Sequence, residues 1–271
     1  MIEKTISILG CGWLGLPVAK ALLAKGYQVK GSTTTPEKLP QLGQAGIQPF
    51  LINLQQPKQP ETIQDFVRDS DWLLVLVPPK IRSGEGENYP KMLHNFITGL
   101  KKNSSLKVIF ISSTSAYPDL NKVITEEDTP TDLTGNYILQ AEKGMQDFFG
   151  DNLTILRFAG LMGPGREPGK FLAGKTNVPN GNAPVNMIHA EDCIGLIAKI
   201  MEQDCLGEIF NASADEHPTR KDFFTKAALK LGLVPPVFAD EPVTSYKEIS
   251  NHKLMQVLGY QFVYPDPLQA I

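Results

Sequence analysis

Three glycines near the N-terminus have the spacing that a dinucleotide-binding turn requires. Gly10, Gly12 and Gly15 follow an apolar strand pattern over 4–9 and open an apolar helical pattern that Gly26 stops. In this spacing the first glycine permits a tight turn, the second lets the backbone approach a pyrophosphate, and the third lets helix and strand pack closely. Because strand, spacing and helix agree, we favour this interpretation over a plain strand-to-helix turn. The predicted cofactor residues of the turn are Gly10, Gly12, Trp13, Leu14 and Gly15.

The residues after the second predicted strand favour NADP over NAD. An NAD site usually carries an acid about 20 residues after the glycines, which binds the ribose 2′-hydroxyl. No Asp or Glu occurs between Gly10 and Pro36. Hydroxyl side chains and a lysine stand there instead, at the start of a predicted helix, and such groups suit a 2′-phosphate. The alternative is that the hydroxyls only cap the helix. The predicted residues are Ser32, Thr33, Thr34 and Lys38.

Strands and helices alternate through the first part of the chain. Strands that alternate with helices form a parallel sheet covered on both faces, with ligands at the carboxyl ends of the strands. The sequence therefore predicts an α/β fold, a doubly wound parallel sheet of the Rossmann type. The predicted strands are 4–9, 27–32, 47–52, 72–77, 107–112 and 153–158. The predicted helices after the glycine turn are 36–44, 61–68, 90–102 and 134–149.

Glycines and prolines crowd the chain after Phe158, which indicates irregular structure over 160–184. A helix at 190–203 and a strand at 208–211 then return to the sheet, and a helix at 219–231 and the tail from 246 belong to a smaller lobe. We predict a Rossmann dinucleotide-binding core of residues 1–158 to which 186–215 return. Residues 159–185 and 216–271 form a small substrate-binding lobe, with substrate in the cleft between lobe and core.

Composition excludes several classes of protein. Lys and Arg number 26 against 29 Asp and Glu, so no basic field exists to bind nucleic acid or an anionic membrane. The longest strongly apolar run, 72–77, is far shorter than the roughly 20 residues of a membrane span. Three scattered cysteines suit neither disulfides nor a metal site and suggest the reducing cytoplasm. We expect a small-molecule substrate and a monomer or homodimer.

Further motifs follow the glycine turn in order. They are FISSTSAYP at 110–118, LRFAGLMGPGR at 156–166, NMIHAED at 186–192, GEIFNASAD at 207–215 and LGY at 258–260. Together these motifs resemble the extended short-chain dehydrogenase/reductase family, also called the NAD-dependent epimerase/dehydratase family. The resemblance implies further contacts with adenine, with the nicotinamide ribose and with the nicotinamide. In that order, the implied residues are Asn53 and Leu54, Pro78 and Pro79, and Ser112 with Ser113.

The family's redox members use a Tyr as acid/base, a Lys four residues later that lowers its pKa, and a Ser or Thr that hydrogen-bonds the reacting carbonyl. Ser113 matches the Ser/Thr position, with a capping hydroxyl as the alternative. None of the seven tyrosines has a Lys four residues later. Tyr137 is the phenol nearest the expected place, but Lys143 points about 240° away around the helix. The candidate catalytic residues are therefore Ser113 and Tyr137 in an atypical member of the family.

Other polar residues have a structural explanation beside a functional one. His189 could act as an acid/base near neutral pH, although this stretch of the family is mostly architectural. Arg157 and Arg166 flank a glycine loop, where Arg166 could hold an anionic substrate. The acidic run 126–128 either borders the cleft or forms a solvated turn.

Two hypotheses of different classes follow. The first is an NADP(H)-binding oxidoreductase, epimerase or dehydratase-like enzyme that acts on a small carbonyl or sugar-like substrate. The second is a catalytically weak protein that senses NADP(H) or docks a partner. The missing Tyr/Lys pair favours the second, whereas Ser113 and the glycine-rich loop favour the first.

Overall fold

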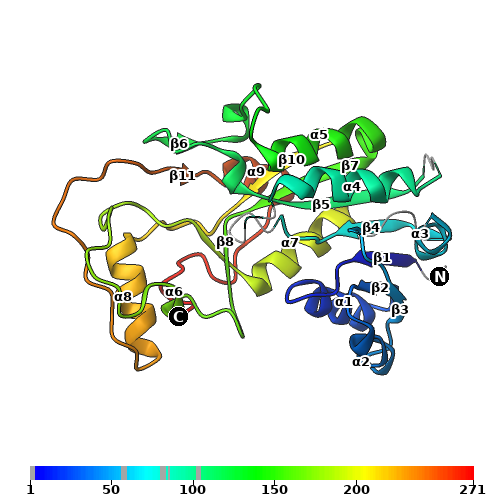
Figure 1. Cartoon of the computed structure of the whole chain (residues 1–271), viewed down its shortest axis with the longest axis horizontal. Coiled ribbons are helices and arrows are strands. Elements are labelled where there is room, and N and C mark those ends of the chain that lie inside the picture. The colour runs from blue at the N-terminus through cyan, green and yellow to red at the C-terminus, as the bar shows by residue number, and fades with distance from the viewer. Residues whose placement is uncertain (1–3, 56–59, 80–83, 85, 102–104) are drawn as a thin grey trace. The chain divides into compact units, whose positions relative to one another are not determined.

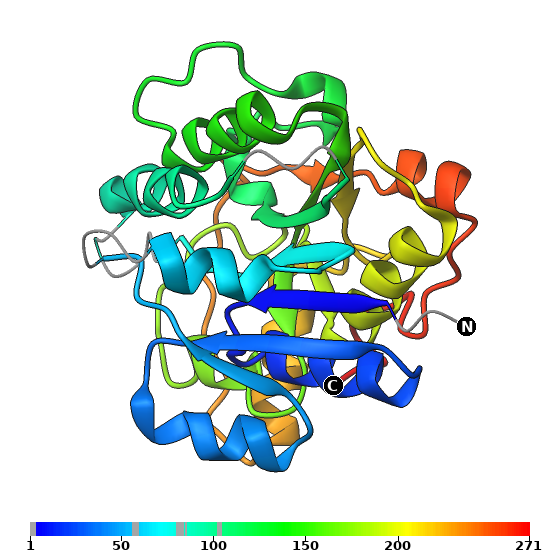
Figure 2. The same cartoon turned by 90° about the vertical axis from the view of Figure 1, so that its right-hand side faces the viewer.

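The computed structural model describes residues 4–55, 60–79, 84, 86–101 and 105–271 (Figure 1). Its largest element is a seven-stranded sheet of order β3-β2-β1-β4-β5-β7-β10. The pairs from β3 to β5 all run parallel, and Figure 2 shows β1 and β2 side by side. The predicted α/β Rossmann fold is confirmed. The strands are β1 Thr5–Leu9, β2 Gln28–Thr33, β3 Gln48–Leu51, β4 Trp72–Val75, β5 Lys107–Ser113, β7 Leu153–Phe158 and β10 Ile209–Ala212.

Two interior strands of this sheet are buried along their whole length. Every residue of β4 and of β7 is buried, as expected for parallel strands covered on both faces. By contrast, β3 at the sheet edge has no fully buried residue. This is why β4 forms a continuous apolar run in the sequence, whereas the edge strand begins with Gln48 and Pro49.

The chain divides into two compact units. Unit 1 comprises Met1–Ser112, Thr131–Leu156 and Ile200–Ile209, and unit 2 comprises Ser113–Pro130, Arg157–Lys199 and Phe210–Ile271. In unit 1, Phe66, Phe96, Val108 and Met145 are among the fully buried residues of the core. The helices of unit 1 are α1 Gly15–Ala24, α2 Leu39–Gln44, α3 Pro60–Val67, α4 Tyr89–Thr98 and α5 Tyr137–Phe149.

Unit 2 has its own apolar cluster, formed by Met162, Val185, Met187, Phe223 and Phe224. Two short parallel pairs, β8 with β9 and β11 with β6, lie in this unit. The strands are β6 Val123–Ile124, β8 Gly160–Met162, β9 Met187–His189 and β11 Glu248–Ile249. The helices are α6 Gly169–Leu172, α8 Arg220–Lys230 and α9 His252–Leu258, and α7 Ala190–Gln203 begins here and ends in unit 1.

Element boundaries differ from the predictions where local polar contacts decide them. Helix α5 begins at Tyr137 rather than at 134, because the Asn136 side chain caps it by accepting from the Leu139 N–H at 3.1 Å. Helix α8 likewise begins after Thr219, whose hydroxyl accepts from the Asp222 N–H. The predicted helix at 90–102 is α4, and its predicted last residue lies outside the described residues. Within the described ranges, no helix is long and apolar enough to cross a membrane.

Candidate functional site

The glycine turn between β1 and α1 has a different physical requirement at each glycine. Gly10 has a φ of +103°, in the left-handed region that favours glycine. A Cβ on Gly15 would lie 2.1 Å from the Gly10 carbonyl oxygen. Helix α1 can therefore lie this close to the turn only because residue 15 is a glycine. At Gly12, which is exposed, nothing lies within 4 Å of the place a Cβ would take. The turn is therefore tight at its first and third glycines and open at its second, where a phosphate would approach the helix N-terminus.

Ser32, at the end of β2, holds this turn in place. Its hydroxyl accepts from the Gly10 N–H at 2.9 Å, and its carbonyl accepts from the Cys11 N–H at 2.8 Å. Ser32 is only 2% exposed. Burial raises the pKa of the Cys11 thiol to about 12, so Cys11 is a neutral packing group. The structural role of Ser32 was not predicted from the sequence.

The other hydroxyls after β2 differ in exposure. Thr33 is buried, and its hydroxyl accepts from the Thr35 N–H at 3.1 Å. Thr34 and Lys38 are both exposed, and Lys38 ends a short 3₁₀ turn. Two of the four predicted 2′-phosphate residues thus serve the local backbone, and two present a hydroxyl and a cation to solvent.

The predicted adenine and ribose residues follow the next two strands of the sheet. The Asn53 side chain accepts from the Gln55 N–H at 3.1 Å, and Leu54 is buried. Pro78 and Pro79 follow β4, where the Tyr89 hydroxyl donates to the Val77 carbonyl at 3.0 Å. All these residues, like the glycine turn, stand at carboxyl ends of strands within unit 1, which is where Rossmann folds bind their ligands.

At the end of β5, Ser112 contacts a buried carboxylate. Its hydroxyl donates to the Glu142 Oε1 at 2.5 Å, and Glu142, on α5, is 4% exposed. A polar group is costly to bury without hydrogen bonds, and Ser112 supplies one of them to this buried side chain. Glu142 was not among the site residues predicted from the sequence. One signal could have identified it, since it lies among the apolar positions of α5, with Ala141 and Met145.

Ser113 and Tyr137 have different surroundings. Ser113 caps the short turn after β5: its hydroxyl accepts from the Ser115 N–H at 3.1 Å and contacts the Ser115 hydroxyl. Ser113 therefore acts as a capping hydroxyl, which was the alternative to its catalytic role. The residue is half-buried. Tyr137 is the first residue of α5 and is also half-buried. Lys143 pairs with Asp147 on the exposed side of that helix, in keeping with its predicted direction away from Tyr137.

A buried polar network in unit 2 contains two further candidates. The Arg157 guanidinium, 1% exposed, donates to the Tyr117 hydroxyl at 2.5 Å and to the Thr129 hydroxyl at 2.7 Å. Tyr117 in turn donates to the Asn211 side chain at 2.8 Å. The Glu126 carboxylate accepts from the Asn211 N–H at 2.6 Å, so this residue is not part of a solvated turn. Arg157 thus ties β7 to the segment before it, and Glu126 accepts from the backbone of β10.

His189 and Asp192 also have structural surroundings. The His189 Nδ1 accepts from the Glu191 N–H at 3.3 Å, which leaves the proton of the neutral ring on Nε2. Burial lowers the pKa of His189, and its ring lies 4.2 Å from that of Tyr264. Fully buried Asp192 accepts from the N–H groups of Val263 and Tyr264 at 2.7 and 3.1 Å. This part of the motif therefore anchors the C-terminal tail.

Comparisons with known proteins agree with the glycine-turn geometry. A family model for the NAD binding domain of 6-phosphogluconate dehydrogenase matches residues 5–134. Protein YeeZ of Escherichia coli (strain K12) is 35% identical over 274 residues, covering 98% of each chain. A solved structure of a putative NAD-dependent epimerase/dehydratase from Methylobacillus flagellatus is 27% identical with a TM-score of 0.76, covering 100% of this chain and 96% of its own.

A more distant neighbour has the same fold. UDP-glucuronic acid 4-epimerase from Bacillus cereus, solved in complex with NAD, is 20% identical with a TM-score of 0.75. The match covers 98% of this chain and 96% of that one.

Among the residues that the structure describes, no group of three His, Cys, Asp or Glu side chains could hold a metal ion.

Proposed function

Since the chain belongs to the extended short-chain dehydrogenase/reductase family and to the same family as YeeZ, we propose that it is an NADP(H)-dependent enzyme acting on a small carbonyl or sugar-like substrate. The observation that carries the proposal is the glycine turn. Gly12 leaves open space at the N-terminus of α1, where the N–H groups of a helix start and the helix dipole favour a phosphate.

The exposed groups after β2 support a preference for NADP. Thr34 and Lys38 offer a hydroxyl donor and a cation, and no carboxylate stands between Gly10 and Pro36 to bind a ribose diol, although the exposed Glu37 precedes Lys38. The solved epimerase from Bacillus cereus contains NAD, so this preference is proposed for this chain on its own residues. Ser32 contributes by fixing the turn through the Gly10 N–H.

For catalysis we propose that Ser113 orients the reacting carbonyl. The bound nicotinamide would supply hydride transfer, and the chain's residues would position the substrate. Ser113 ends β5 and is half-buried, which leaves a hydroxyl at the carboxyl end of the strand. Tyr137 has no Lys four residues later, so the partner that the family's redox members place beside their catalytic Tyr is missing. We therefore assign Tyr137 the smaller role.

The second candidate function is a sensor of NADP(H) or a docking protein without turnover. The observation that favours it is the absence of a Tyr-x-x-x-Lys pair from the whole sequence. The two functions share the cofactor site and differ only in chemistry. Turnover therefore separates them, whereas binding does not.

The experiment is calorimetric titration with NADP⁺, NADPH, NAD⁺ and NADH, followed by a screen of carbonyl compounds and nucleotide sugars with the coenzyme that binds. We expect NADPH to bind at least about tenfold more tightly than NADH. With any substrate found, Ser113→Ala should lower turnover about a hundredfold while coenzyme affinity stays unchanged. An inactive Tyr137→Phe beside an active Ser113→Ala would refute the assignment, and tight NADPH binding without turnover would favour the sensor.

A further inference from the structure

Helix α8 carries an unusual charge for this chain. Its eleven residues include four cations and one acid, whereas the chain as a whole has a net charge of −3. The apolar side of the helix is buried through Phe223, Phe224, Ala227 and Ala228. The opposite side of the helix carries three lysines. All three lysines are exposed, so the charge of α8 is concentrated on a surface of unit 2.

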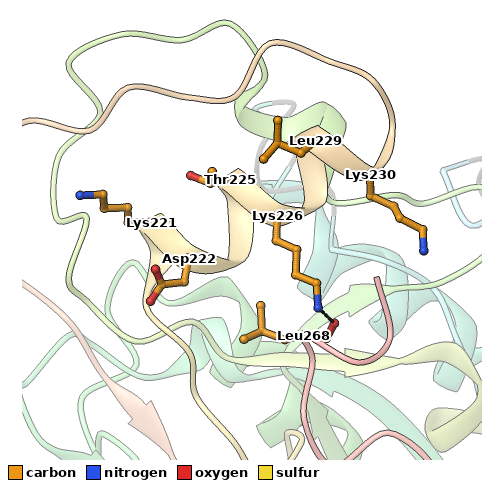
Figure 3. Close-up of a pocket in the computed structure, with 7 residues that line it drawn as sticks. All are labelled: Lys221, Asp222, Thr225, Lys226, Leu229, Lys230 and Leu268. Atoms are coloured by element: carbon orange, nitrogen blue, oxygen red, sulfur yellow. Dashed lines mark hydrogen bonds between the residues drawn. The ribbon is translucent and has the colours of Figure 1, made fainter.

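A shallow groove follows this exposed side of α8 (Figure 3). Lys226 reaches from the helix to the C-terminal tail, where its Nζ donates to the Leu268 carbonyl at 2.8 Å. Lys221 and Lys230 lie toward the two ends of the helix. Leu229 lies next to Lys230 near one end of the helix and is 59% exposed, a large apolar side chain left in water. The groove thus combines separated cations with an apolar contact.

The charges of two lysines in the groove are not neutralised. The one acid of α8, Asp222, also lines the groove, where the Thr219 hydroxyl donates to its Oδ2 at 2.7 Å, so the lining carries three lysines and one carboxylate. Lys226 is held by the Leu268 carbonyl. Within the described residues, neither Lys221 nor Lys230 has an acidic partner. These two cations are nine residues apart on the helix, which corresponds to about 14 Å along its axis and about half a turn around it, so they flank the exposed face on its two sides.

We propose that this face of α8 docks an acidic segment of a partner protein that also carries an apolar side chain. Carboxylates of the segment would pair with Lys221 and Lys230, and its apolar side chain would cover Leu229. Charge complementarity identifies this occupant. A membrane surface needs clusters of about four to eight cations, and a nucleic-acid backbone needs several phosphate contacts. Two uncommitted lysines around a single leucine match a short peptide instead.

The probe is a fluorescein-labelled helical peptide of repeated Glu-Leu-Ala-Glu units, titrated with the full-length protein and followed by fluorescence anisotropy. Charge reversal in Lys221→Glu/Lys230→Glu should weaken binding at least about tenfold. The matched control, Lys20→Glu/Lys91→Glu, changes two exposed helical lysines of unit 1 and the same net charge, and should bind within about twofold of the parent. Leu229→Ala, or a peptide with Ala in place of Leu, should weaken binding by a smaller factor.

Several results would overturn the proposal. One is equal peptide affinity of the parent and Lys221→Glu/Lys230→Glu, and another is no peptide binding by the parent. Binding to phosphatidylserine vesicles without peptide binding would make the surface a membrane contact. If light scattering found a dimer that the double variant dissociates, the occupant would be a second copy. NADPH affinity should be the same in all these variants, so failure of the docking proposal is distinguishable from failure of the cofactor site.

Discussion

The glycine turn of unit 1 and the Asp192 anchor of unit 2 are built in opposite ways. The turn depends on missing side chains: Gly15 allows the backbone to close, and Gly12 leaves space open. The anchor depends on one buried carboxylate, Asp192, which holds backbone N–H groups more than 70 residues later in the chain. Local spacing specifies the first, and contacts far apart in sequence specify the second. We therefore expect substitutions at the turn to separate binding from folding, and substitutions at the anchor to affect folding directly.

The largest effect on stability should come from Asp192→Ala. This change leaves the Val263 and Tyr264 N–H groups and the Tyr260 hydroxyl without their acceptor. Buried donors that lose their acceptor are costly, and hydrogen bonds to a carboxylate are among the strong ones. The free energy of unfolding, measured by urea denaturation, should therefore fall by about 3 kcal/mol. Asp192→Asn keeps an acceptor oxygen, so its free energy of unfolding should fall clearly less than that of Asp192→Ala. If Asp192→Ala is as stable as the parent, the tail is anchored by other contacts.

Gly15→Ala tests the closed part of the turn. The added Cβ would lie 2.1 Å from the Gly10 carbonyl oxygen, so the helix or the turn must shift. We expect a loss of about 1–3 kcal/mol in stability, together with weaker coenzyme binding. Gly144→Ala is the matched control, because nothing lies within 4 Å of a Cβ on this glycine of α5. Equal thermal stability of the two variants would contradict the tight packing at Gly15.

Lys38→Glu tests the exposed groups after β2. A carboxylate in place of the cation would repel a 2′-phosphate, so the preference for NADPH over NADH should fall about tenfold or more, which corresponds to about 1.4 kcal/mol. Stability should hardly change, since Lys38 is exposed. The measurement is the ratio of the two dissociation constants by calorimetry. An unchanged ratio would mean that the residues after β2 serve the helix start alone.

The smallest effect is a pH dependence at His189. Burial lowers its pKa in the folded protein, while nearby Asp192 and Glu191 oppose the shift. The unfolded chain then binds the proton more readily, so stability falls as the pH drops through about 6.5 toward the folded pKa and is unaffected above it. His189→Gln removes this contribution. Urea denaturation gives the free energy of unfolding at about pH 7.5 and about pH 5, and its decrease between the two should be smaller in the variant than in the parent. The same decrease in both proteins would argue against the effect of burial.

The sequence predicted those parts of the molecule that depend on local rules. The alternation of strands and helices, the glycine turn and the order of the motifs follow from periodicity and spacing, and the Rossmann fold was predicted from them. Strand and helix ends were displaced by a few residues where caps such as Asn136 decide them.

Contacts between distant residues could not be predicted in this way. Ser32 holds a turn 22 residues earlier, Ser112 meets a carboxylate 30 residues later, and Glu126 accepts from an N–H 85 residues away. No periodic pattern pairs such residues, because each partner is chosen by the folded sheet and not by its neighbours in the chain. For this reason the sequence left two interpretations of the acidic run at 126–128 open, a border of the cleft and a solvated turn.

The most direct test of the central claim is coenzyme binding by Gly12→Val. The valine side chain would occupy the open space at the turn without meeting any protein atom near its Cβ, so the protein should remain folded. We predict that calorimetric titration with NADPH shows at least about a hundredfold loss of affinity, with a melting temperature close to that of the parent. Gly144→Val, also in open space, should bind NADPH normally. Parental NADPH affinity in a folded Gly12→Val protein would contradict the assignment of this turn as the cofactor site.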